Sequence, residues 1–506
     1  MFRKGIAVLM GTCLAAGVLG GCGSSADTGE TTNVQADEQS TASKTSDEEP
    51  YHAVLVYVVA SDSQDQDMVE EAFNKLTMEQ LNMEVTLMPM TFSTWTSQLP
   101  LMLAGGEQVD LFPMFNSSAT TYISSDYIVD LSGYLENYGP DLVSTVGEDA
   151  ILCCSIGDFI YGVPTMKERC VPNGFVVRTD CLEAAGIDAE NIKTYQDMTE
   201  VFKKVQDLYP NMTMFGGGST ATPAGQSVSM DGLGNSFGVL EDYGQVTEIT
   251  NYYESEQFRE LCQLTREWYK AGYVSEDMAT CTDSGEVLMK AGNLFAYMTN
   301  CKPNTKQEKD DLTGYDTTII QMDKDMLSTT STSAVSYAVG SSSENPAKAV
   351  ELLNWISKTK EANDLLNWGI EGIHWEVQED GTIDYPQGVT AESCGYHQNF
   401  GYIMPNQFNS HVWKGNPPDI FEKYQEVEDN AIVSKAYGFS PDLSGVADQV
   451  AALTDVQSQY LAQLTTGSVE PEAVIEEFNE ALYKAGLQDV MDAKQEQLDE
   501  WLKNKE

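Results

Sequence analysis

The feature that most constrains the fold is an alternation of short apolar runs and amphipathic stretches between residues 53 and 115. The run AVLVYVVA at residues 53–60 is almost continuously apolar and β-branched, which is typical of a strand buried on both faces. An amphipathic stretch follows, and its apolar side chains share one helical face: Met68, Ala72, Phe73, Leu76 and Leu81. The segments MEVTLMPM, TWTSQLPLMLAGGE and VDLFPMF then predict a strand, a helix and a strand. The order β-α-β-α-β predicts right-handed crossovers and a twisted parallel sheet.

Polar and aromatic residues follow the ends of the predicted strands. Asp62 comes after the first strand, and Phe115 and Asn116 come at the end of the third. Tyr161 lies in the segment DFIYGVP, just before the chain leaves the first α/β region. Because ligands bind outside the carboxyl ends of parallel strands, we expect these four residues at a ligand site. The alternatives are a helix cap for Asp62 and core packing for the aromatic residues.

A second α/β region begins after this segment. Residues 175–187 open it, and helical stretches follow at 194–208 and 254–271. Residues 286–300 predict a short helix and a strand, and residues 334–356 predict a strand, a Ser-rich turn and a helix with proline in its first turn. The chain closes with helical segments.

Five segments in this order resemble the bacterial ABC-transporter extracellular solute-binding proteins of the maltodextrin/oligosaccharide-binding type: TSQLPLMLAGGEQVDLF, DFIYGVPT, FVVRTDCLEAAGI, EVLMKAGNLFAYM and SENPAKAVELLNWI. The tail from about residue 400, with EEFNEALYKAGLQDVMDAKQEQLDEWL, is similar to a C-terminal domain of uncharacterised function found on lipoproteins of that family. The resemblance implies an α/β, two-lobe periplasmic-binding-protein fold of type II with a helical C-terminal region. It also implies a ligand in the cleft between the lobes, which close around it by a hinge motion.

The resemblance further implies where the lobes divide. Crossings between them are expected near three segments: 164–172, 285–300 and 325–340. We therefore expect a first lobe of two segments, 51–165 and 286–335. The second lobe is expected to consist of 166–285 and 336–506, with the C-terminal domain at about 400–506.

A sugar-binding cleft needs aromatic platforms for C–H faces and carboxylates or amides for hydroxyl groups. The segment NWGIEGIHWEV, residues 367–377, offers both, and the family has a similar Gly-Ile-Glu-Gly element. We expect Trp368 to stack on a sugar and Glu371 to accept from hydroxyl groups. The alternative is that the tryptophans pack in the core, as we expect for Trp355 on its helix.

Two further segments are candidates for the cleft. Trp413 lies among polar residues in FNSHVWKGN rather than on an apolar face. Asp231 and Phe237 lie in the glycine-rich segment MDGLGNSFGVL, which is expected to form a loop. We include all three among the candidate ligand-binding residues.

The N-terminus predicts export. Arg3 and Lys4 precede an apolar segment of 16 residues, fewer than the roughly 20 that a spanning helix needs, so residues 1–21 read as a signal peptide. Its end, LGGC at 19–22, resembles the lipobox of bacterial lipoproteins, which implies lipidation of Cys22. The alternative is an ordinary signal peptide that contains a cysteine by chance.

The segment after the predicted cleavage site looks like a tether. Residues 23–50 hold ten Ser or Thr residues and seven acids against one lysine, without Leu, Ile, Met or aromatic residues. Such a composition cannot bury enough apolar surface to offset its ordering entropy, so residues 22–50 are expected to be disordered. The tether and its lipid predict a protein held at the outer face of the cell membrane.

The charge of the chain excludes several partners. The formal net charge is −50, and −52 without Arg3 and Lys4, which argues against nucleic acid and against adsorption to anionic lipid. It also disfavours strongly anionic ligands, although Lys167, Arg169 or Arg178 would locally oppose that effect.

Metal and catalytic signatures are weak. The four histidines form no HExxH or paired pattern, DSQDQD lacks EF-hand spacing, and no GxSxG motif stands out. We expect no metal and no cofactor. Eight cysteines follow Cys22, and the adjacent pair Cys153 and Cys154 suits a disulfide framework poorly, so mostly free thiols are expected.

Two classes of function remain. The leading one is a monomeric binding protein, not an enzyme, that captures an oligosaccharide and delivers it to the membrane permease of an ABC importer. A peptide is the alternative ligand within this class. The competing class is a surface-anchored glycoside hydrolase or lyase, which would need two carboxyl groups about 5–10 Å apart, one with a raised pKa.

Overall fold

The first sheet begins with three parallel strands joined by two helices. In the computed structural model, which describes residues 49–226 and 229–505, these elements follow in the predicted order: β1 (Tyr51–Val59), α1 (Gln66–Leu81), β2 (Met83–Thr91), α2 (Phe92–Gly105) and β3 (Leu111–Phe115). β1 is buried along most of its length and pairs in parallel with β2 and β3. The predicted β-α-β-α-β unit is therefore confirmed. The predicted signal peptide, Cys22 and all but the last two residues of the tether lie outside the described residues.

Two strands that arrive later in the chain complete this sheet in the order β2-β1-β3-β14-β6. β14 (Val335–Val339) runs antiparallel to β3 and to β6 (Val163–Pro164). Two long helices from the same part of the chain, α15 (Pro346–Lys358) and α16 (Lys360–Trp368), pack on the sheet face that carries Leu55 and Tyr57. These helices place Trp368 at the end of α16, so the sheet positions one candidate site residue directly.

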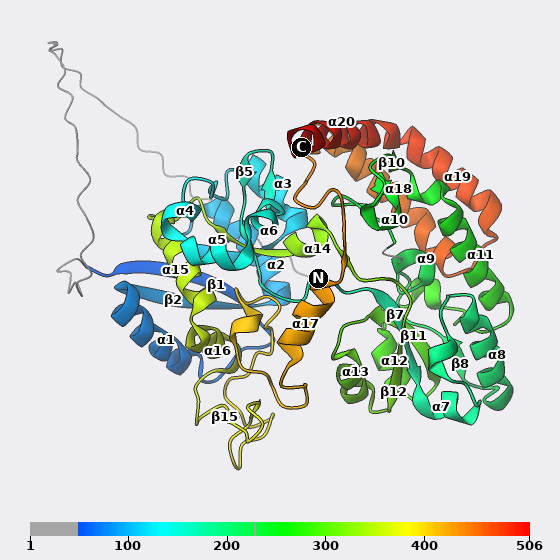
Figure 1. Ribbon diagram of the computed structural model, residues 1–506, viewed down its shortest axis with the longest axis horizontal. Helices are drawn as coiled ribbons and strands as arrows, with labels where there is room; N and C mark the ends of the chain where they lie inside the picture. Colours follow the sequence, from blue (N-terminus) through cyan, green and yellow to red (C-terminus); the bar gives the residue numbers. More distant parts are fainter. Residues whose placement is uncertain (1–48, 227–228, 506) are drawn as a thin grey trace, which may run out of the picture. The chain divides into compact units, whose positions relative to one another are not determined.

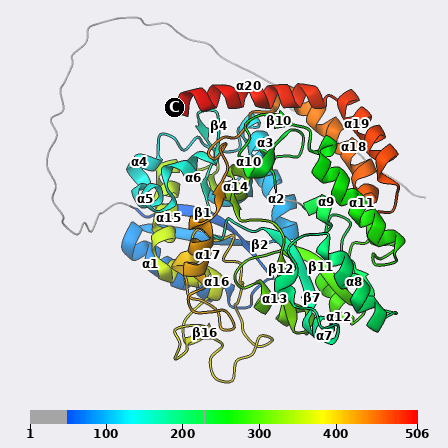
Figure 2. The same cartoon turned by 45° about the vertical axis from the view of Figure 1, so that its right-hand side comes forward.

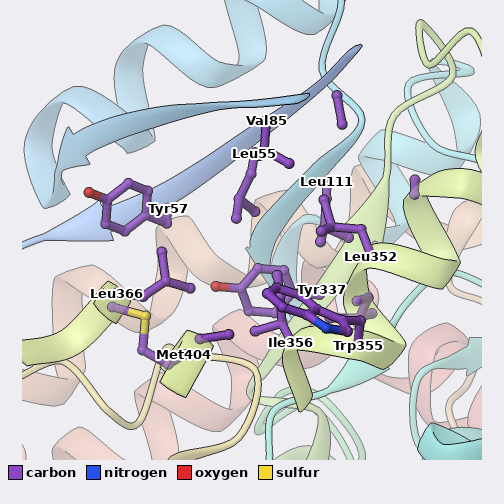
Figure 3. Close-up of a cluster of buried hydrophobic side chains, with 14 of the residues drawn as sticks. Leu55, Tyr57, Val85, Leu111, Tyr337, Leu352, Trp355, Ile356, Leu366 and Met404 are labelled. Atoms are coloured by element: carbon purple, nitrogen blue, oxygen red, sulfur yellow. The ribbon is translucent and has the colours of Figure 1, made fainter. Parts of the chain in front are cut away.

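The core on this face joins strands and helices that are distant in sequence. Figure 3 shows Leu55, Val85 and Leu111 of the strands on the same side as Leu352, Trp355 and Ile356 of α15. The indole N–H of Trp355 donates to Oε1 of Gln80 at 2.8 Å, so its polar atom is satisfied while its rings are buried, as expected. Shorter elements of this lobe are α3 (Ala119–Ser124), α4 (Leu135–Tyr138), α5 (Pro140–Val146), α6 (Glu148–Leu152), β4 (Ser155–Ile156), β5 (Phe159–Ile160), β15 (Glu376–Val377) and β16 (Ile383–Asp384).

The second sheet has the order β12-β7-β11-β8. Its strands are β7 (Asn173–Arg178), β8 (Thr213–Phe215), β11 (Leu294–Asn300) and β12 (Thr317–Gln321), and β7 runs antiparallel to both neighbours. The helices of this lobe are α7 (Thr179–Ala184), α8 (Asp197–Leu208), α9 (Pro223–Gln226), α10 (Glu241–Gly244), α11 (Glu256–Lys270), α12 (Gly285–Lys290) and α13 (Thr305–Thr313). Two short strands, β9 (Val239–Leu240) and β10 (Ile249–Thr250), form a hairpin beside them.

The C-terminal helices pack on the second lobe. They are α18 (Ala447–Thr465), α19 (Pro471–Lys484) and α20 (Leu487–Lys505), and they share a buried cluster with α11 that includes Phe258, Leu464 and Phe478. Figures 1 and 2 show α18 and α19 lying along α11 in both views. The predicted helical C-terminal region is therefore observed, and it is continuous with the core of the second lobe.

The division between the lobes differs from the expected one in its later segments. β11, within the expected first-lobe segment 286–335, is an inner strand of the second sheet, so the chain does not cross near 285–300. β14, α15 and α16, within the expected second-lobe segment 336–506, belong to the first lobe. Local patterns identify each strand but not its partner, because pairing is decided by tertiary packing that only distant segments supply.

Three segments connect the lobes. Residues 165–172 lead from β6 to β7, and residues 322–334 lead from β12 to β14 through β13 (Met326–Leu327) and α14 (Thr329–Ser333). The third connection, which the sequence reading did not locate, runs through α17 (Ile420–Asp429) to β17 (Ile432–Val433), which pairs with β13.

Two further properties of the described residues concern their helices and their cysteines. None of their helices is both long and apolar enough to span a bilayer. Their eight cysteines are all free thiols, and six of them are buried. Burial raises the pKa of Cys154 and, to about 12, that of Cys262, which keeps both protonated at neutral pH.

Candidate functional site

A cavity of about 500 Å³ brings together residues of both lobes. The first lobe contributes Trp368, at the C-terminus of α16, and the segment 399–416, which contains Trp413. The second lobe contributes polar residues of α13 and the segment before it, and Glu168 comes from the connection between the lobes. Two residues predicted from sequence, Trp368 and Trp413, therefore line the same cavity.

The two tryptophans form a stacked pair. Their ring centroids are 5.1 Å apart and their planes differ by 29°. Trp368 is 4% exposed and its indole N–H donates to the carbonyl oxygen of His411 at 3.1 Å, whereas Trp413 is half-buried. The inner ring is thus fixed by packing and a hydrogen bond, and the outer ring is available to a ligand. The burial of Trp368 fits the alternative of core packing, and the ligand role of Trp413 stays a prediction.

Further rings hold Trp413 from the side. The ring of Tyr385 meets it edge-on at 4.8 Å, and the imidazole of His397 lies 4.3 Å from it. Burial lowers the pKa of His397 to about 4, so the ring is neutral at pH 7. An uncharged aromatic surround is a suitable setting for an indole platform that stacks on the C–H face of a sugar.

A second wall of the cavity is polar and charged. Nζ of Lys302 lies 3.2 Å from Oε1 of Glu168 and 3.4 Å from Oε2 of Glu308. Burial favours the neutral amine, but these two carboxylates outweigh it and raise the pKa of Lys302. Gln407 donates to the second oxygen of Glu168 at 3.1 Å. The wall therefore offers carboxylate oxygens, an ammonium group and amides, which together can pair with hydroxyl groups as donors or acceptors.

A second contact ties this wall to the third connection. Asn304 donates from Nδ2 to Oδ1 of Asn416 at 2.9 Å and accepts from the hydroxyl of Tyr424 at 2.8 Å. Tyr402, which also lines the cavity, is 38% exposed. These residues, together with Lys302 and Glu308, are site residues that sequence reasoning missed. They come from ordinary polar stretches that carry no motif, so only the fold reveals them.

Asn116 and Tyr161, both predicted, line a separate cavity of about 380 Å³. Nδ2 of Asn116 donates to Oγ of Ser333 in α14 at 3.3 Å, so Asn116 contacts the second connection between the lobes. Tyr161 is buried, and burial raises its pKa well above the usual value. Phe439 and Val450 of the C-terminal region line the other side. Asn116 and Tyr161 thus line a cavity other than the Trp413 cavity, and Tyr161 is also part of a core cluster.

Asp231 and Phe237 lie in the predicted glycine-rich loop but have different surroundings. Asp231 lines a third cavity, of about 450 Å³, together with Arg169 from the first connection. Burial raises the pKa of Asp231, and the nearby ammonium of Lys494 opposes that shift. Phe237 is buried in the cluster that joins α11 to the C-terminal helices. The structure thus assigns Phe237 to the core.

Three predicted residues do not line these cavities in the described part of the chain: Asp62, Phe115 and Glu371. Asp62 is exposed after β1, and Glu371 is exposed in a turn where it bridges to Trp375. Phe115 packs its half-buried ring edge-on against Trp95 at 4.8 Å. Gly369 ends α16 with φ of +83°, and the Gly-Ile-Glu-Gly element that begins there does not line the cavity.

Comparison with known proteins decides the family. Residues 59–363 match the family described as bacterial extracellular solute-binding protein. The chain belongs to this family. Residues 435–503 match a second family, described as a domain of unknown function, DUF3502. Both matches confirm the resemblance drawn from the sequence, including the uncharacterised domain in the tail.

Relatives of this solute-binding protein extend the match to most of the chain. A carbohydrate ABC transporter substrate-binding protein of Streptococcus pneumoniae serotype 4 is 22% identical over 436 residues, covering 85% of this chain and 87% of the relative. The crystal structure of the N-glycan transport solute binding protein NgtS from Streptococcus pneumoniae covers 90% of this chain and 100% of its own, with a TM-score of 0.79 and 21% identity.

A second NgtS structure, in complex with Man5GlcNAc, has a TM-score of 0.70 and 21% identity, and covers 90% of this chain and 99% of its own. These likenesses confirm the two-lobe α/β fold of the solute-binding protein.

Proposed function

We propose that this solute-binding protein captures an oligosaccharide in the cavity around Trp413 and delivers it to the permease of an ABC importer. The main support for this proposal is that the stacked pair of Trp368 and Trp413 and a polar wall line the same cavity. A sugar presents both an apolar face and a rim of hydroxyl groups, and the cavity offers a matching surface to each. The relatives point the same way, since one is described as carbohydrate-binding and another was crystallised with a glycan.

The position of the cavity supports capture by lobe closure. Glu168 and Lys302 meet at the first connection, and Asn304 and Asn416 meet at the third. A ligand in this cavity contacts both lobes, and a ligand that binds the closed arrangement better shifts the protein toward it.

Glu308, one of the carboxyl groups that line the cavity, is poorly suited to be the general acid of a glycoside hydrolase. A general acid for glycosidic cleavage needs a raised pKa. Burial favours the protonated form of Glu308, but the ammonium groups of Lys302 and Lys309 outweigh it and lower the pKa of this carboxyl. Glu308 therefore stays ionised, which suits an acceptor for sugar hydroxyl groups. We accordingly propose a binding protein that leaves its ligand unchanged.

The location of the protein is part of the proposal. The family is extracellular, and the lipobox-like residues 19–22 support attachment through a lipid on Cys22. The acidic residues of 23–50 would then act as a spacer between the membrane and the lobes. The expected partners are the transmembrane subunits of the importer, with the protein acting as a monomer.

A thermal-shift screen tests the proposed function. The purified chain is heated with Man5GlcNAc, with maltotriose and kestose, and with short peptides, and the recovered sugar is analysed by chromatography. A ligand at 100 times its dissociation constant is expected to stabilise the fold by about 2.7 kcal/mol. An oligosaccharide that raises the melting temperature and is recovered intact supports the proposal. A shift with peptides alone favours a peptide-binding protein, and shortened sugar indicates an enzyme.

A further inference from the structure

Three charged residues of the polar wall, Glu168, Lys302 and Glu308, belong to a row of alternating charges that continues to Lys309 and Glu286, which do not line the Trp413 cavity. Nζ of Lys309 lies 2.8 Å from Glu286 and 3.1 Å from Glu308, and Glu308 lies 3.4 Å from Lys302. Lys302 in turn pairs with Glu168 at 3.2 Å. These five residues contribute three carboxylates and two ammonium groups, so together they carry a formal charge of −1.

Of the two lysines in this row of charges, Lys302 is the one that lines the cavity. Its side chain is 25% exposed, while that of Glu168 is 10% exposed and that of Glu308 is 37% exposed. A group that approaches Lys302 from the cavity also approaches both of its carboxylate partners. An anionic ligand would meet one positive and two negative charges at short range, and like charges in a partly buried setting repel with little screening.

The other charged groups near the cavity do not reverse this balance. Lys167 is outside the residues that line the cavity; its ammonium donates to the backbone carbonyl of Glu168 at 3.0 Å, and burial lowers its pKa. Asp311 adds a further carboxylate to the lining. Among the described lining residues the remaining lysine is Lys414, whose ammonium lies 2.6 Å from Asp384 and whose side chain is 60% exposed. An exposed pair of this kind is screened by water and salt and contributes little to binding.

Hydroxyl groups, in contrast, satisfy this wall without adding charge. Carboxylate oxygens of Glu168 and Glu308 can accept from them, and the amides of Asn304, Gln307 and Asn399 can donate or accept. A site built from buried polar groups rejects a ligand that cannot pair with them or that leaves one of them unpaired. The wall therefore favours sugar rings that carry only hydroxyl groups over sugar rings that carry a negative charge.

We infer that Glu168 and Glu308 are specificity-determining residues, which neutralise Lys302 and make the cavity select uncharged oligosaccharides over uronate-containing ones. This inference rests on the proposed function, and it adds a rule for which sugars are captured. Without the two carboxylates, Lys302 would be an unpaired cation facing the ligand, and the same cavity would accept a sugar carboxylate.

The test compares a matched pair of probes, mannotriose and the corresponding mannuronate trimer, which differ only in the oxidation of C6. Titration calorimetry is run on the wild type, on Glu308→Gln, on the double variant Glu168→Gln/Glu308→Gln, and on Glu422→Gln as a control. Glu422 lies on α17, is exposed, and is outside the residues that line the cavity. The melting temperature of each variant, measured without sugar, checks that it is folded.

The wild type and the control are expected to bind mannotriose at least tenfold more tightly than the uronate trimer. The single variant should have a smaller ratio of mannotriose affinity to uronate affinity. The double variant should bind the uronate trimer at least tenfold more tightly than the wild type does, and this gain should decrease as salt is added. A wild type that binds both probes equally, or a double variant without the gain, overturns the specificity but leaves the proposed function standing. Binding of neither probe by the wild type, together with no shift in the thermal screen, contradicts the proposed function and the specificity with it.

Discussion

Trp368 and Trp413 stack at 5.1 Å although 45 positions separate them in the chain, and the pair forms the aromatic wall of the cavity. The inner ring is fixed by its hydrogen bond to the carbonyl of His411, and the outer ring is half-buried. The carboxylate of Asp364 accepts from the backbone N–H of His411 at 2.8 Å and lies 2.7 Å from its Nδ1, so the support extends to α16. The platform is therefore ordered before a ligand arrives, which lowers the entropy cost of binding.

We predict that Trp413→Ala weakens oligosaccharide binding at least tenfold, a loss of about 1.4 kcal/mol or more. The reason is that the change removes the ring that faces the ligand while Trp368 keeps its buried position. Titration calorimetry with the tightest sugar from the thermal screen measures the effect. The control is Trp501→Ala on α20, where the ring packs against Phe439 outside the cavity. Equal sugar affinities of the wild type and Trp413→Ala would show that the ring of Trp413 does not bind the sugar.

The half-buried His397 is expected to make the fold less stable in acid. Its pKa is about 4 in the folded chain, below the ordinary value of 6.5 for an unfolded histidine. Between these values the unfolded state takes up the proton and the folded state does not, so stability falls as the pH drops from 6.5 toward 4. The full shift corresponds to about 3 kcal/mol as an upper figure.

Denaturant unfolding between pH 7 and pH 4 measures this contribution. His397→Gln is expected to lose part of the pH dependence seen in the wild type. His52→Gln, which changes an exposed histidine on β1, is the matched control and should keep the wild-type profile. A His397→Gln profile that runs parallel to the wild type would show that His397 is not the group that titrates.

Lys494 of α20 is expected to be critical for stability. Its Nζ is fully buried and donates to the carbonyl oxygens of Gly232 and Gly238 at 3.0 and 2.8 Å and to Oδ1 of Asn235 at 2.9 Å. Burial lowers the pKa of Lys494 to about 7, and the negative charge of Asp231 opposes this shift. Lys494→Met removes these hydrogen bonds and the positive charge near the buried Asp231, although backbone N–H groups still donate to Gly232, Asn235 and Asp231. We predict a loss of about 3–5 kcal/mol in the free energy of unfolding.

The matched control for this change is Lys503→Met, one residue of the same helix that is exposed. Urea unfolding of the three proteins measures the difference. We expect the control to lie within about 0.5 kcal/mol of the wild type, as is usual for surface positions. If Lys494→Met were equally stable, the C-terminal helix would not hold the 231–238 loop through its ammonium group.

Sequence reasoning succeeded where local patterns decide the structure. The run at residues 53–60 forms β1 and the stretch after it forms α1. A strand buried on both faces and an amphipathic helix each have a characteristic pattern of apolar residues in the sequence. It failed where pairing between distant strands decides. The segment 286–300 was correctly read as a helix and a strand, α12 and β11, but its assignment to the first lobe was wrong because β11 pairs with β7.

The same distinction explains the candidate site. Trp368 could be proposed from its place beside the Gly-Ile-Glu-Gly element and Trp413 from its polar neighbours in sequence, and the structure places both in one cavity. Glu371 was proposed beside Trp368, but Gly369 turns the chain and leaves Glu371 exposed. Lys302 gave no sequence signal, since its role depends on meeting Glu168 across 134 positions of the chain.

In the proposed function, a sugar is held between the lobes in the Trp413 cavity and is released unchanged. The most direct test is titration calorimetry of the full chain with neutral oligosaccharides, followed by chromatography of the recovered sugar. We expect one bound oligosaccharide per chain, recovered at its original length, and weaker binding by Trp413→Ala. Absence of binding at millimolar sugar, or recovery of shorter products, would contradict it.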